Sequence, residues 1–253
     1  MTPTVSVVIP YSPKYTTEAM LEEARASVRA QSIPTEVVVV DDVDTGPADA
    51  RNAGLERAES RYVAFLDADD RWKPGKLTRQ LDRMDATGAG LCVEGEPVSM
   101  DEFVYRVLLG EMTSLTSSIL LDTAQVPTTF ESGLDRGEDL LFVLEAATEG
   151  GVCCCPDLFT RRRHDRSMMA TGLPVEEFVA ADKRFAYLVS QRVPAAQPYI
   201  TPYYVQSFTQ AGLQCHREGE YDRALSYFGR ALRIAPHPYT LLYLCRTLLR
   251  RAL

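Results

Sequence analysis

The chain has 253 residues, of which 45% are hydrophobic and 25% charged, a composition typical of globular proteins that fold in water. The net charge of −8 argues against broad nucleic-acid binding, because proteins that bind nucleic acids present a basic surface. No apolar run reaches the roughly 20 residues that span a bilayer, and the first ten residues lack the basic flank of a secretory signal. The sequence therefore predicts a cytoplasmic protein.

The first hundred residues alternate between strand and helix patterns. We predict strands at residues 5–9, 36–40, 62–66 and 90–94, and helices at 16–32 and 47–60. The first three strands are nearly continuous apolar runs, as expected for parallel strands that are covered on both faces. The pattern predicts an α/β fold with a mainly parallel sheet, and such sheets bind ligands beyond the carboxyl ends of their strands.

Acidic residues follow two of these strands. Asp41 and Asp42 come after the second strand, and Asp67, Asp69 and Asp70 come after the third. Any one aspartate has a simple explanation as a turn residue, but five at one sheet edge would repel one another unless a cation lay among them. Asp67 and Asp69 are two residues apart, so both can face the same way, and carboxylate oxygens suit Mg²⁺ or Mn²⁺. A divalent metal and a bound diphosphate are therefore predicted at this edge.

Five segments, in order, resemble the signature blocks of family 2 glycosyltransferases with the GT-A (Rossmann-like) fold. They are VSVVIPYSPKY, VVVVDDVDTGPADARNAG, RYVAFLDADDRWKP, FESGLDRGEDLLFVLEAATEGG and FTRRRHDRS, and together they cover residues 5–167. The first block departs from the usual pattern, because Tyr-Ser-Pro-Lys stands where Thr-Tyr-Asn-Arg is common. The resemblance implies a transferase domain over residues 1–172. It also implies inverting transfer of a sugar, of hexosyltransferase type, from a UDP- or GDP-sugar to a hydroxyl of a glycan or a lipid-linked glycan.

The resemblance also implies roles for the acidic strand end. Asp67 and Asp69 form the DxD motif, in which Asp69 is the direct ligand of Mn²⁺ or Mg²⁺. Asp67 is expected to contact the ribose or to support the metal from the second layer of residues. Asp70 is expected only to orient the turn.

The same resemblance implies contacts to the nucleotide-sugar donor. Asp42 is expected to read the nucleotide, and Pro10 and Tyr11 to line the same edge. Arg51 resembles the family's Arg-Asn pair near the nucleotide, and a surface salt bridge is an equally good interpretation of this residue. Arg163 and His164 fall where a closing loop covers the diphosphate, although a run of basic residues is more often a solvated face.

Asp139 resembles the catalytic base of the family. It precedes a strongly apolar helix, LLFVLEAATEG, and a carboxylate in this position also complements the helix dipole. As a base, it would accept the proton of the acceptor hydroxyl while that hydroxyl attacks the sugar. Glu138 is expected to support it.

The six cysteines form no CxxC pair and no disulfide framework. The adjacent residues Cys153, Cys154 and Cys155 would point to alternate sides of a strand, so they cannot all hold one zinc ion. We predict that these cysteines are small buried side chains.

From about residue 173 the pattern is helical throughout. Residues 205–238 resemble one tetratricopeptide repeat (TPR), and a single repeat cannot bury its own apolar face. It is expected to dock on the transferase domain, on a second copy or on a protein partner. The last helix combines five leucines with Arg246, Arg250 and Arg251, which also suits a peripheral position at the inner face of the membrane. Because the leucines occupy more than one face, the sequence favours burial against protein.

Two other functions are compatible with this pattern. A degenerate transferase domain could serve as a protein-interaction module through its TPR-like tail, but the set Asp42, Asp67, Asp69 and Asp139 is intact. A nucleotidyltransferase would need a Gly-rich phosphate loop after the first strand, and PYSPKY is not one. The sequence therefore favours the glycosyltransferase.

Overall fold

The structure is a computed structural model that describes residues 5–41, 46–112, 116–134, 136–165 and 173–252. The chain divides into two compact units. The first comprises Met1–Phe103, Met112–Gly133 and Glu138–Thr171, and the second comprises Val104–Glu111, Leu134–Gly137 and Gly172–Leu253. The predicted domain boundary at residue 172 stays a proposal.

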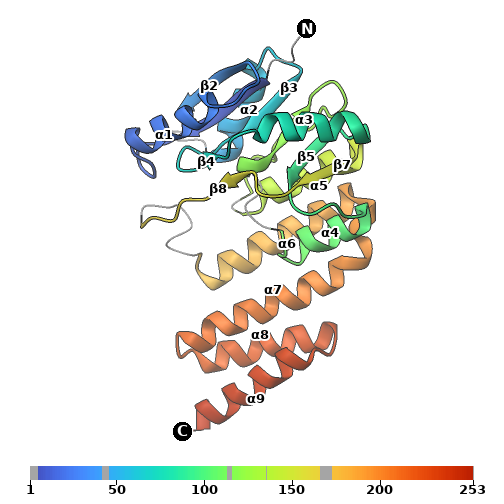
Figure 1. Cartoon of the computed structure of the whole chain (residues 1–253). Helices are drawn as coiled ribbons and strands as arrows, with labels where there is room; N and C mark the ends of the chain where they lie inside the picture. The colour runs from blue at the N-terminus through green and yellow to red at the C-terminus, as the bar shows by residue number, and fades with distance from the viewer. Residues whose placement is uncertain (1–4, 42–45, 113–115, 135, 166–172, 253) are drawn as a thin grey trace. The chain divides into compact units, whose positions relative to one another are not determined.

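The first unit is built on a six-stranded sheet (Figure 1). Its strand order is β2-β1-β3-β6-β5-β7, with bounds β1 Val5–Tyr11, β2 Thr35–Asp41, β3 Tyr62–Phe65, β5 Leu91–Glu94, β6 Leu120–Asp122 and β7 Val152–Cys155. Neighbouring strands are parallel except at β6, which runs antiparallel to β3 and β5. The predicted mainly parallel α/β sheet is confirmed. Strand β7 holds the three adjacent cysteines, and β6 is a strand that the sequence patterns did not predict.

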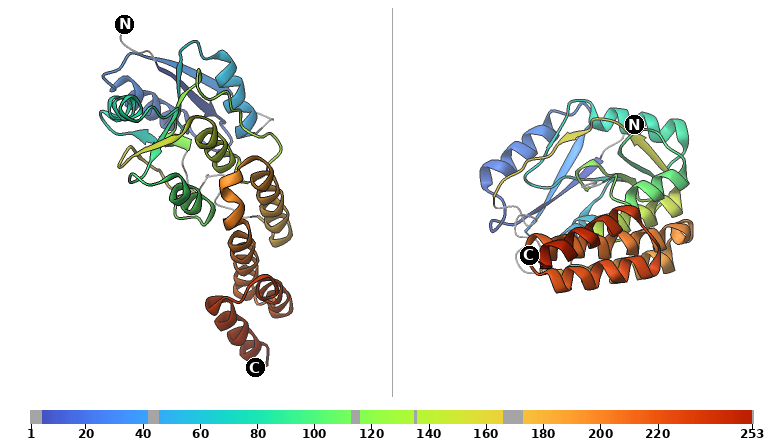
Figure 2. Two further views of the ribbon diagram at one scale, coloured as in Figure 1. Left: turned by 90° about the vertical axis from the view of Figure 1, so that its right-hand side faces the viewer. Right: turned by 90° about the horizontal axis from the view of Figure 1, so that it is seen from below.

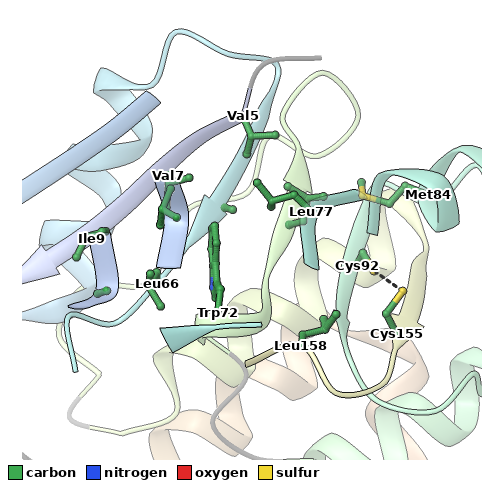
Figure 3. Packing of buried hydrophobic residues seen from close by; sticks show 14 of the residues in the cluster. Val5, Val7, Ile9, Leu66, Trp72, Leu77, Met84, Cys92, Cys155 and Leu158 are labelled. Atoms are coloured by element: carbon green, nitrogen blue, oxygen red, sulfur yellow. Dashed lines mark hydrogen bonds between the residues drawn. The ribbon is translucent and has the colours of Figure 1, made fainter. Parts of the chain in front are cut away.

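Helices α1 (Glu18–Arg29) and α3 (Lys76–Thr87) cover one face of the sheet. The core on this face includes Val5, Val7 and Ile9 of β1 (Figure 3). Thr17 caps α1 by accepting a hydrogen bond from the backbone N–H of Met20. The other face packs against α2 (Pro47–Arg57) and α5 (Glu138–Gly150).

On that second face, close approach of α2 depends on a glycine. A Cβ at Gly54 would lie 2.2 Å from a methyl carbon of Val8, which no side chain tolerates. The rings of Phe65 and Phe142 meet edge to face at 5.8 Å, so α5 packs on β3. Successive residues of β1 thus enter opposite cores, which explains why the strand is apolar throughout.

The cysteines of this unit are buried, as predicted. Cys92 and Cys155 lie on the face covered by α3, with their sulfur atoms 3.8 Å apart (Figure 3). They come from β5 and β7, which pair in parallel. The sulfur atoms pack as small core groups.

A two-stranded ribbon lies beyond the carboxyl end of β3. Strand β4 (Arg71–Trp72) pairs antiparallel with β8 (Phe159–Thr160). The ribbon brings the segment that follows β3 beside the segment that leads to His164. Two parts of the chain that lie about ninety residues apart therefore reach the same edge of the sheet.

The second unit is helical, which confirms the predicted C-terminal helical region. It contains α6 (Val175–Arg192), the short helix η3 (Pro194–Ala196), α7 (Gln197–Arg217), α8 (Tyr221–Ile234) and α9 (Pro238–Ala252), together with most of α4 (Met100–Leu108). Helices α7, α8 and α9 lie side by side (Figure 2). A Cβ at Gly212 of α7 would come within 2.6 Å of the ring of Phe228 in α8, so this glycine permits their close packing. A TPR-like character stays a prediction.

No helix in the described ranges combines the length and the apolar character needed to cross a bilayer.

Candidate active site

The ends of β1, β2 and β3 form one edge of the sheet. Tyr11 and Asp41 are register partners at the ends of β1 and β2, and the N–H of Leu66 donates to the carbonyl of Val8. Asp67 and Asp69 therefore follow β3 at the edge where Pro10 and Tyr11 follow β1. Pro10 and Tyr11 are partly buried and Asp41 is exposed, whereas Asp42 lies outside the described residues.

Asp69 lies against His164. The Oδ2 atom of Asp69 is 3.0 Å from Nε2 of His164, and both side chains are mostly buried. The other ring nitrogen of His164, Nδ1, is buried without a hydrogen-bond partner among the described residues. Asp69 is predicted as a metal ligand and His164 as a donor contact. The structure places the carboxylate of one within hydrogen-bonding distance of the imidazole of the other.

Arg162 fixes the segment that carries His164. Its backbone N–H donates to Oδ1 of Asp70 at 3.0 Å, and its Nε donates to the backbone oxygen of Asp69 at 3.2 Å. Its guanidinium also pairs with Glu23 of α1. The predicted donor contact Arg163 is exposed, so the neighbouring arginine is the one that holds this segment in place.

Ser117 organises the turn after β3 from the short helix η1 (Thr116–Ser118). Its hydroxyl donates to Oδ2 of Asp70 at 2.6 Å and accepts from the backbone N–H of Asp67 at 3.1 Å. Burial and the nearby charge of Asp67 raise the pKa of Asp70 to about 7. Asp70 is only 5% exposed, which agrees with its predicted role in orienting the turn.

Arg51 lies between the strand end and the first turn of α5. Its terminal nitrogens contact Oδ1 of Asp67 at 3.1 Å and Oε1 of Glu138 at 2.9 Å. Burial alone lowers the pKa of Arg51, but the charges of Asp67, Glu138 and Asp139 outweigh it and raise the pKa above its ordinary value. With a side chain 6% exposed, Arg51 is not a surface salt bridge, and one of the two interpretations left open by the sequence is wrong.

Asp139 begins α5 beside these groups. Its Oδ2 accepts a hydrogen bond from the hydroxyl of Thr116 at 3.3 Å, and its Oδ1 accepts from the N–H of Leu140 at 2.9 Å. Burial, followed by the adjacent charge of Glu138, raises the pKa of Asp139 to about 6. A carboxyl with this pKa is still ionised at neutral pH and is a stronger base than an ordinary aspartate.

Asp69 and His164 together offer a carboxylate oxygen and an imidazole nitrogen that could hold a divalent metal. In the described ranges, no three His, Cys, Asp or Glu side chains form a cluster that could hold a metal by themselves. Metals that work on phosphates commonly take one or two protein ligands and complete their shell with phosphate oxygens and water. A carboxylate suits both Mg²⁺ and Mn²⁺, and an added imidazole nitrogen favours Mn²⁺ of the two.

Arg162, Ser117 and Thr116 are residues that sequence reasoning missed as parts of this site. Ser117 and Thr116 lie in a segment with no strand or helix periodicity, about fifty residues from Asp67 and about twenty from Asp139. Their hydroxyl groups become informative only once the fold brings them to the carboxylates. Arg162 belongs to the basic run that the sequence analysis noted, but nothing in that run distinguishes its three arginines.

Residues 43–137 match the family model described as Glycosyl transferase family 2. The putative teichuronic acid biosynthesis glycosyltransferase TuaG of Bacillus subtilis (strain 168) is 36% identical over 138 residues, which cover 41% of this chain and 53% of TuaG. The chain spans about half the length of the curated relatives it matches.

Two solved structures resemble most of the chain. TarS of S. aureus (residues 1–349, in complex with UDP-GlcNAc) has a TM-score of 0.66 at 18% identity, covering 92% of this chain and 82% of that one. The mannosyltransferase PcManGT of Pyrobaculum calidifontis, in complex with GDP-Man and Mn²⁺, has a TM-score of 0.59 at 14% identity, covering 98% and 81%. At these identities the likeness concerns the fold, and it confirms the predicted GT-A fold.

Proposed function

We propose that this chain, which contains a family 2 glycosyltransferase domain, is a metal-dependent inverting glycosyltransferase. One observation carries the proposal: Asp67 and Asp69 at the end of β3, His164 after β8 and Asp139 at the start of α5 converge on one edge of the sheet. Transfer from a nucleotide sugar needs charge neutralisation at the leaving diphosphate and a base for the attacking hydroxyl. This edge offers groups suited to both tasks.

The donor is a UDP- or GDP-sugar in this proposal. TarS is described with UDP-GlcNAc and PcManGT with GDP-Man, which supports a nucleotide sugar as the class. Asp69 and His164 would hold Mn²⁺, or Mg²⁺ as the alternative, and the bound ion would neutralise the diphosphate that leaves. Pro10, Tyr11 and Asp42 are proposed to contact the nucleotide, and Arg163 the diphosphate.

Asp139 is the proposed catalytic base. Its carboxylate would accept the proton from the acceptor hydroxyl as that oxygen bonds to the anomeric carbon, while the bond from that carbon to the diphosphate breaks. A direct attack of this kind inverts the anomeric centre without a covalent intermediate on the enzyme. Thr116 holds the carboxylate in place, and Arg51 balances the charges of Asp67 and Glu138 close to it.

The acceptor is proposed to be a hydroxyl of a growing glycan, free or linked to lipid. TuaG is named for teichuronic acid biosynthesis, which supports a polysaccharide as the acceptor class. The alternative is a catalytically degenerate domain that serves only for protein interaction. Such a domain would not need Asp67, Asp69 and Asp139 at one edge of the sheet.

The test is a screen for donor binding followed by a transfer assay. Thermal unfolding of the full chain is measured with UDP, GDP and their common sugar conjugates, each with Mn²⁺, with Mg²⁺ and with EDTA. We expect stabilisation by one nucleotide class that requires the metal, and then transfer from its sugar conjugate to a glycan acceptor. A chain that binds none of these donors under any condition would support the interaction module instead.

A further inference from the structure

Helix α9 turns polar side chains toward its neighbours and leucines toward solvent. Thr240 and Thr247 are fully buried, and their hydroxyls contact Thr209 of α7 at 2.7 Å and His216 at 2.8 Å. The outward side carries four leucines that are 47–69% exposed, namely Leu241, Leu242, Leu248 and Leu249. The inward side also carries Tyr243 and Leu244, which pack against the core of the helical unit, so α9 has apolar side chains on both its inward and its outward side. An ordinary surface helix keeps its apolar side chains on the side that faces the core.

The exposed leucines form one continuous arc. At 100° per residue, Leu248, Leu241, Leu249 and Leu242 follow one another within about a third of the helix circumference. From the sequence alone, the leucines are expected on more than one face of the helix, and burial against protein is favoured for that reason. In the structure only Leu244 of the five leucines lies on the inward side, so that reason no longer holds.

Arginines border this arc on one side. The same helical spacing places Arg246 and Arg250 next to Leu242, whereas Arg251 lies beyond Leu244 on the other side, toward α8. Helix α9 contains no acidic residue, and residues 203–253 carry seven arginines against three acidic residues. Arg251 pairs with Asp222 of α8, whereas Arg246 lies over the ring of Tyr243. We therefore expect that a partner which covers this arc is apolar where it meets the leucines and negatively charged where it meets the arginines.

This charge pattern favours a lipid surface over a second copy of the chain. Two copies of α9 packed face to face would bring arginines together without acidic partners on either helix. An arc one helix wide and four leucines long is also much smaller than the roughly 800 Å² per partner of a stable protein interface. An anionic bilayer offers acyl chains to the leucines and phosphate groups to the arginines.

We propose that α9 is an interfacial membrane-binding helix, which inserts Leu241, Leu242, Leu248 and Leu249 among the acyl chains of an anionic lipid surface. Arg246 and Arg250 contact the lipid phosphates with their guanidinium groups, because long side chains can reach the head groups while their stems stay apolar. The helix lies in the plane of the interface and does not cross it. Binding by one such helix is reversible and salt-dependent.

Flotation of the full chain with vesicles tests this proposal. We use vesicles of phosphatidylcholine alone and of phosphatidylcholine with 30–40% phosphatidylglycerol, a range on the order of natural anionic membranes. The chain should float with the anionic vesicles at low salt and dissociate at high salt. Leu242→Ser/Leu249→Ser should lower the partition coefficient at least about tenfold, and Arg246→Gln and Arg250→Gln should each lower it about fivefold.

Matched variants separate this helix from general surface effects. Tyr187→Ser removes a similarly exposed large side chain from α6, and Arg57→Gln removes an exposed arginine from α2. Neither should change flotation. Equal binding to both vesicle types, no binding to either, or loss of binding in the two control variants overturns the proposal.

A second measurement addresses self-association. Sedimentation of the chain without lipid should give a monomer, and a dimer that Leu242→Ser/Leu249→Ser abolishes would show that a second copy covers the arc. The leucine variant should bind nucleotide and Mn²⁺ like the wild type. The membrane proposal can therefore fail while the proposed function stands, and the proposed function can fail while the membrane proposal stands.

Discussion

The hydroxyl of Thr116 donates a hydrogen bond to Oδ2 of Asp139, and this contact ties the candidate base to the short helix that also holds the turn after β3. The donating residue and the accepting residue come from segments that no sequence pattern connects. Ser117, the next residue, bonds to Asp67 and Asp70 in the turn after β3. The short helix η1 therefore contacts both the proposed metal-binding end of the sheet and the proposed base.

Asp139→Asn should retain donor binding and lose turnover by roughly 10²-fold or more, as expected for the removal of a general base. The amide has the same shape but cannot take a proton. The measurement is kcat together with the dissociation constant of the nucleotide in Mn²⁺. In the wild type, kcat/KM should fall as the pH drops through about 6, because protonation of Asp139 in the free enzyme removes the base. Near-normal turnover in the variant would transfer the role to Glu138.

Thr116→Val should lower kcat about tenfold while the KM for the donor changes little, because the hydroxyl orients the base and does not contact the donor in our proposal. A hydrogen bond to a carboxylate favours its charged form, so losing that bond should raise the pKa of Asp139. The acidic limb of the pH–rate profile should therefore move to higher pH. Thr116→Ser keeps the hydroxyl and should restore both properties, and an unmoved profile in the valine variant would contradict a positioning role.

Asp69→Ala should abolish transfer and remove the metal dependence of nucleotide binding, because the carboxylate is the proposed metal ligand. The fold should persist, since the side chain lies at the edge of the sheet and not in its core. Isothermal titration with UDP or GDP, with and without Mn²⁺, measures the effect. Asp82→Ala, which removes an exposed aspartate from α3, serves as the matched control. A variant that still binds nucleotide more tightly in Mn²⁺ would remove Asp69 from the metal site.

Arg51→Met should destabilise the fold by about 3–5 kcal/mol, because it leaves the carboxylates of Asp67 and Glu138 without their buried partner. The free energy of unfolding in urea measures this loss. Adding Asp67→Asn to the variant should recover part of it, since one of the two unpaired charges is then absent. Arg57→Met on the same helix is exposed and should change stability by no more than about 0.5 kcal/mol. If Arg51→Met and Arg57→Met changed the free energy of unfolding equally, the ion pairs of Arg51 with Asp67 and Glu138 would contribute no stability.

Lys76 makes stability depend on pH, because it is a fully buried lysine in α3. Its Nζ donates to Gln80 at 2.6 Å and lies over the ring of Trp72, and burial lowers its pKa from 10.5 to about 7. The unfolded chain binds the proton more tightly, so protonation favours unfolding. The folded state should lose stability as the pH falls from about 10 to about 7, with no further loss from this group below pH 7.

Lys76→Met should be more stable than the wild type at pH 7, and this advantage should shrink by on the order of 2 kcal/mol or more by pH 9.5. Urea unfolding of both proteins at the two pH values provides the measurement. The exposed Lys183→Met should show no such change with pH. A constant difference between wild type and Lys76→Met across this range would mean that Lys76 stays charged in the folded state.

Local patterns in the sequence were sufficient to predict the strands and helices that position the candidate site. The apolar runs of β1, β2 and β3 and the helices between them follow from side-chain periodicity and from the Thr17 cap, which act over a few residues. Once the strands are parallel, their ends share one edge, and so Asp67 and Asp69 had to lie near Tyr11. The place of Asp139 at the start of an apolar helix was likewise readable from neighbouring residues.

Other features required the tertiary structure, because they join residues that are distant in the chain. The double ion pair of Arg51 connects positions 16 and 87 residues away, and the contact of His164 with Asp69 spans 95. The antiparallel insertion of β6 depends on its neighbours, since its three residues carry no periodicity of their own.

The sequence of α9 by itself determined a basic helix rich in leucine, because composition and helical spacing are local properties. Only the packing of α7 and α8 decided that its threonines face inward and its leucines outward. The buried hydroxyl of Thr240 bonds to Thr209, and that of Thr247 to His216, so both threonines can face the neighbouring helices with their hydroxyl groups paired. Helical periodicity shows which residues share a side, but it contains no information about which side meets the rest of the protein.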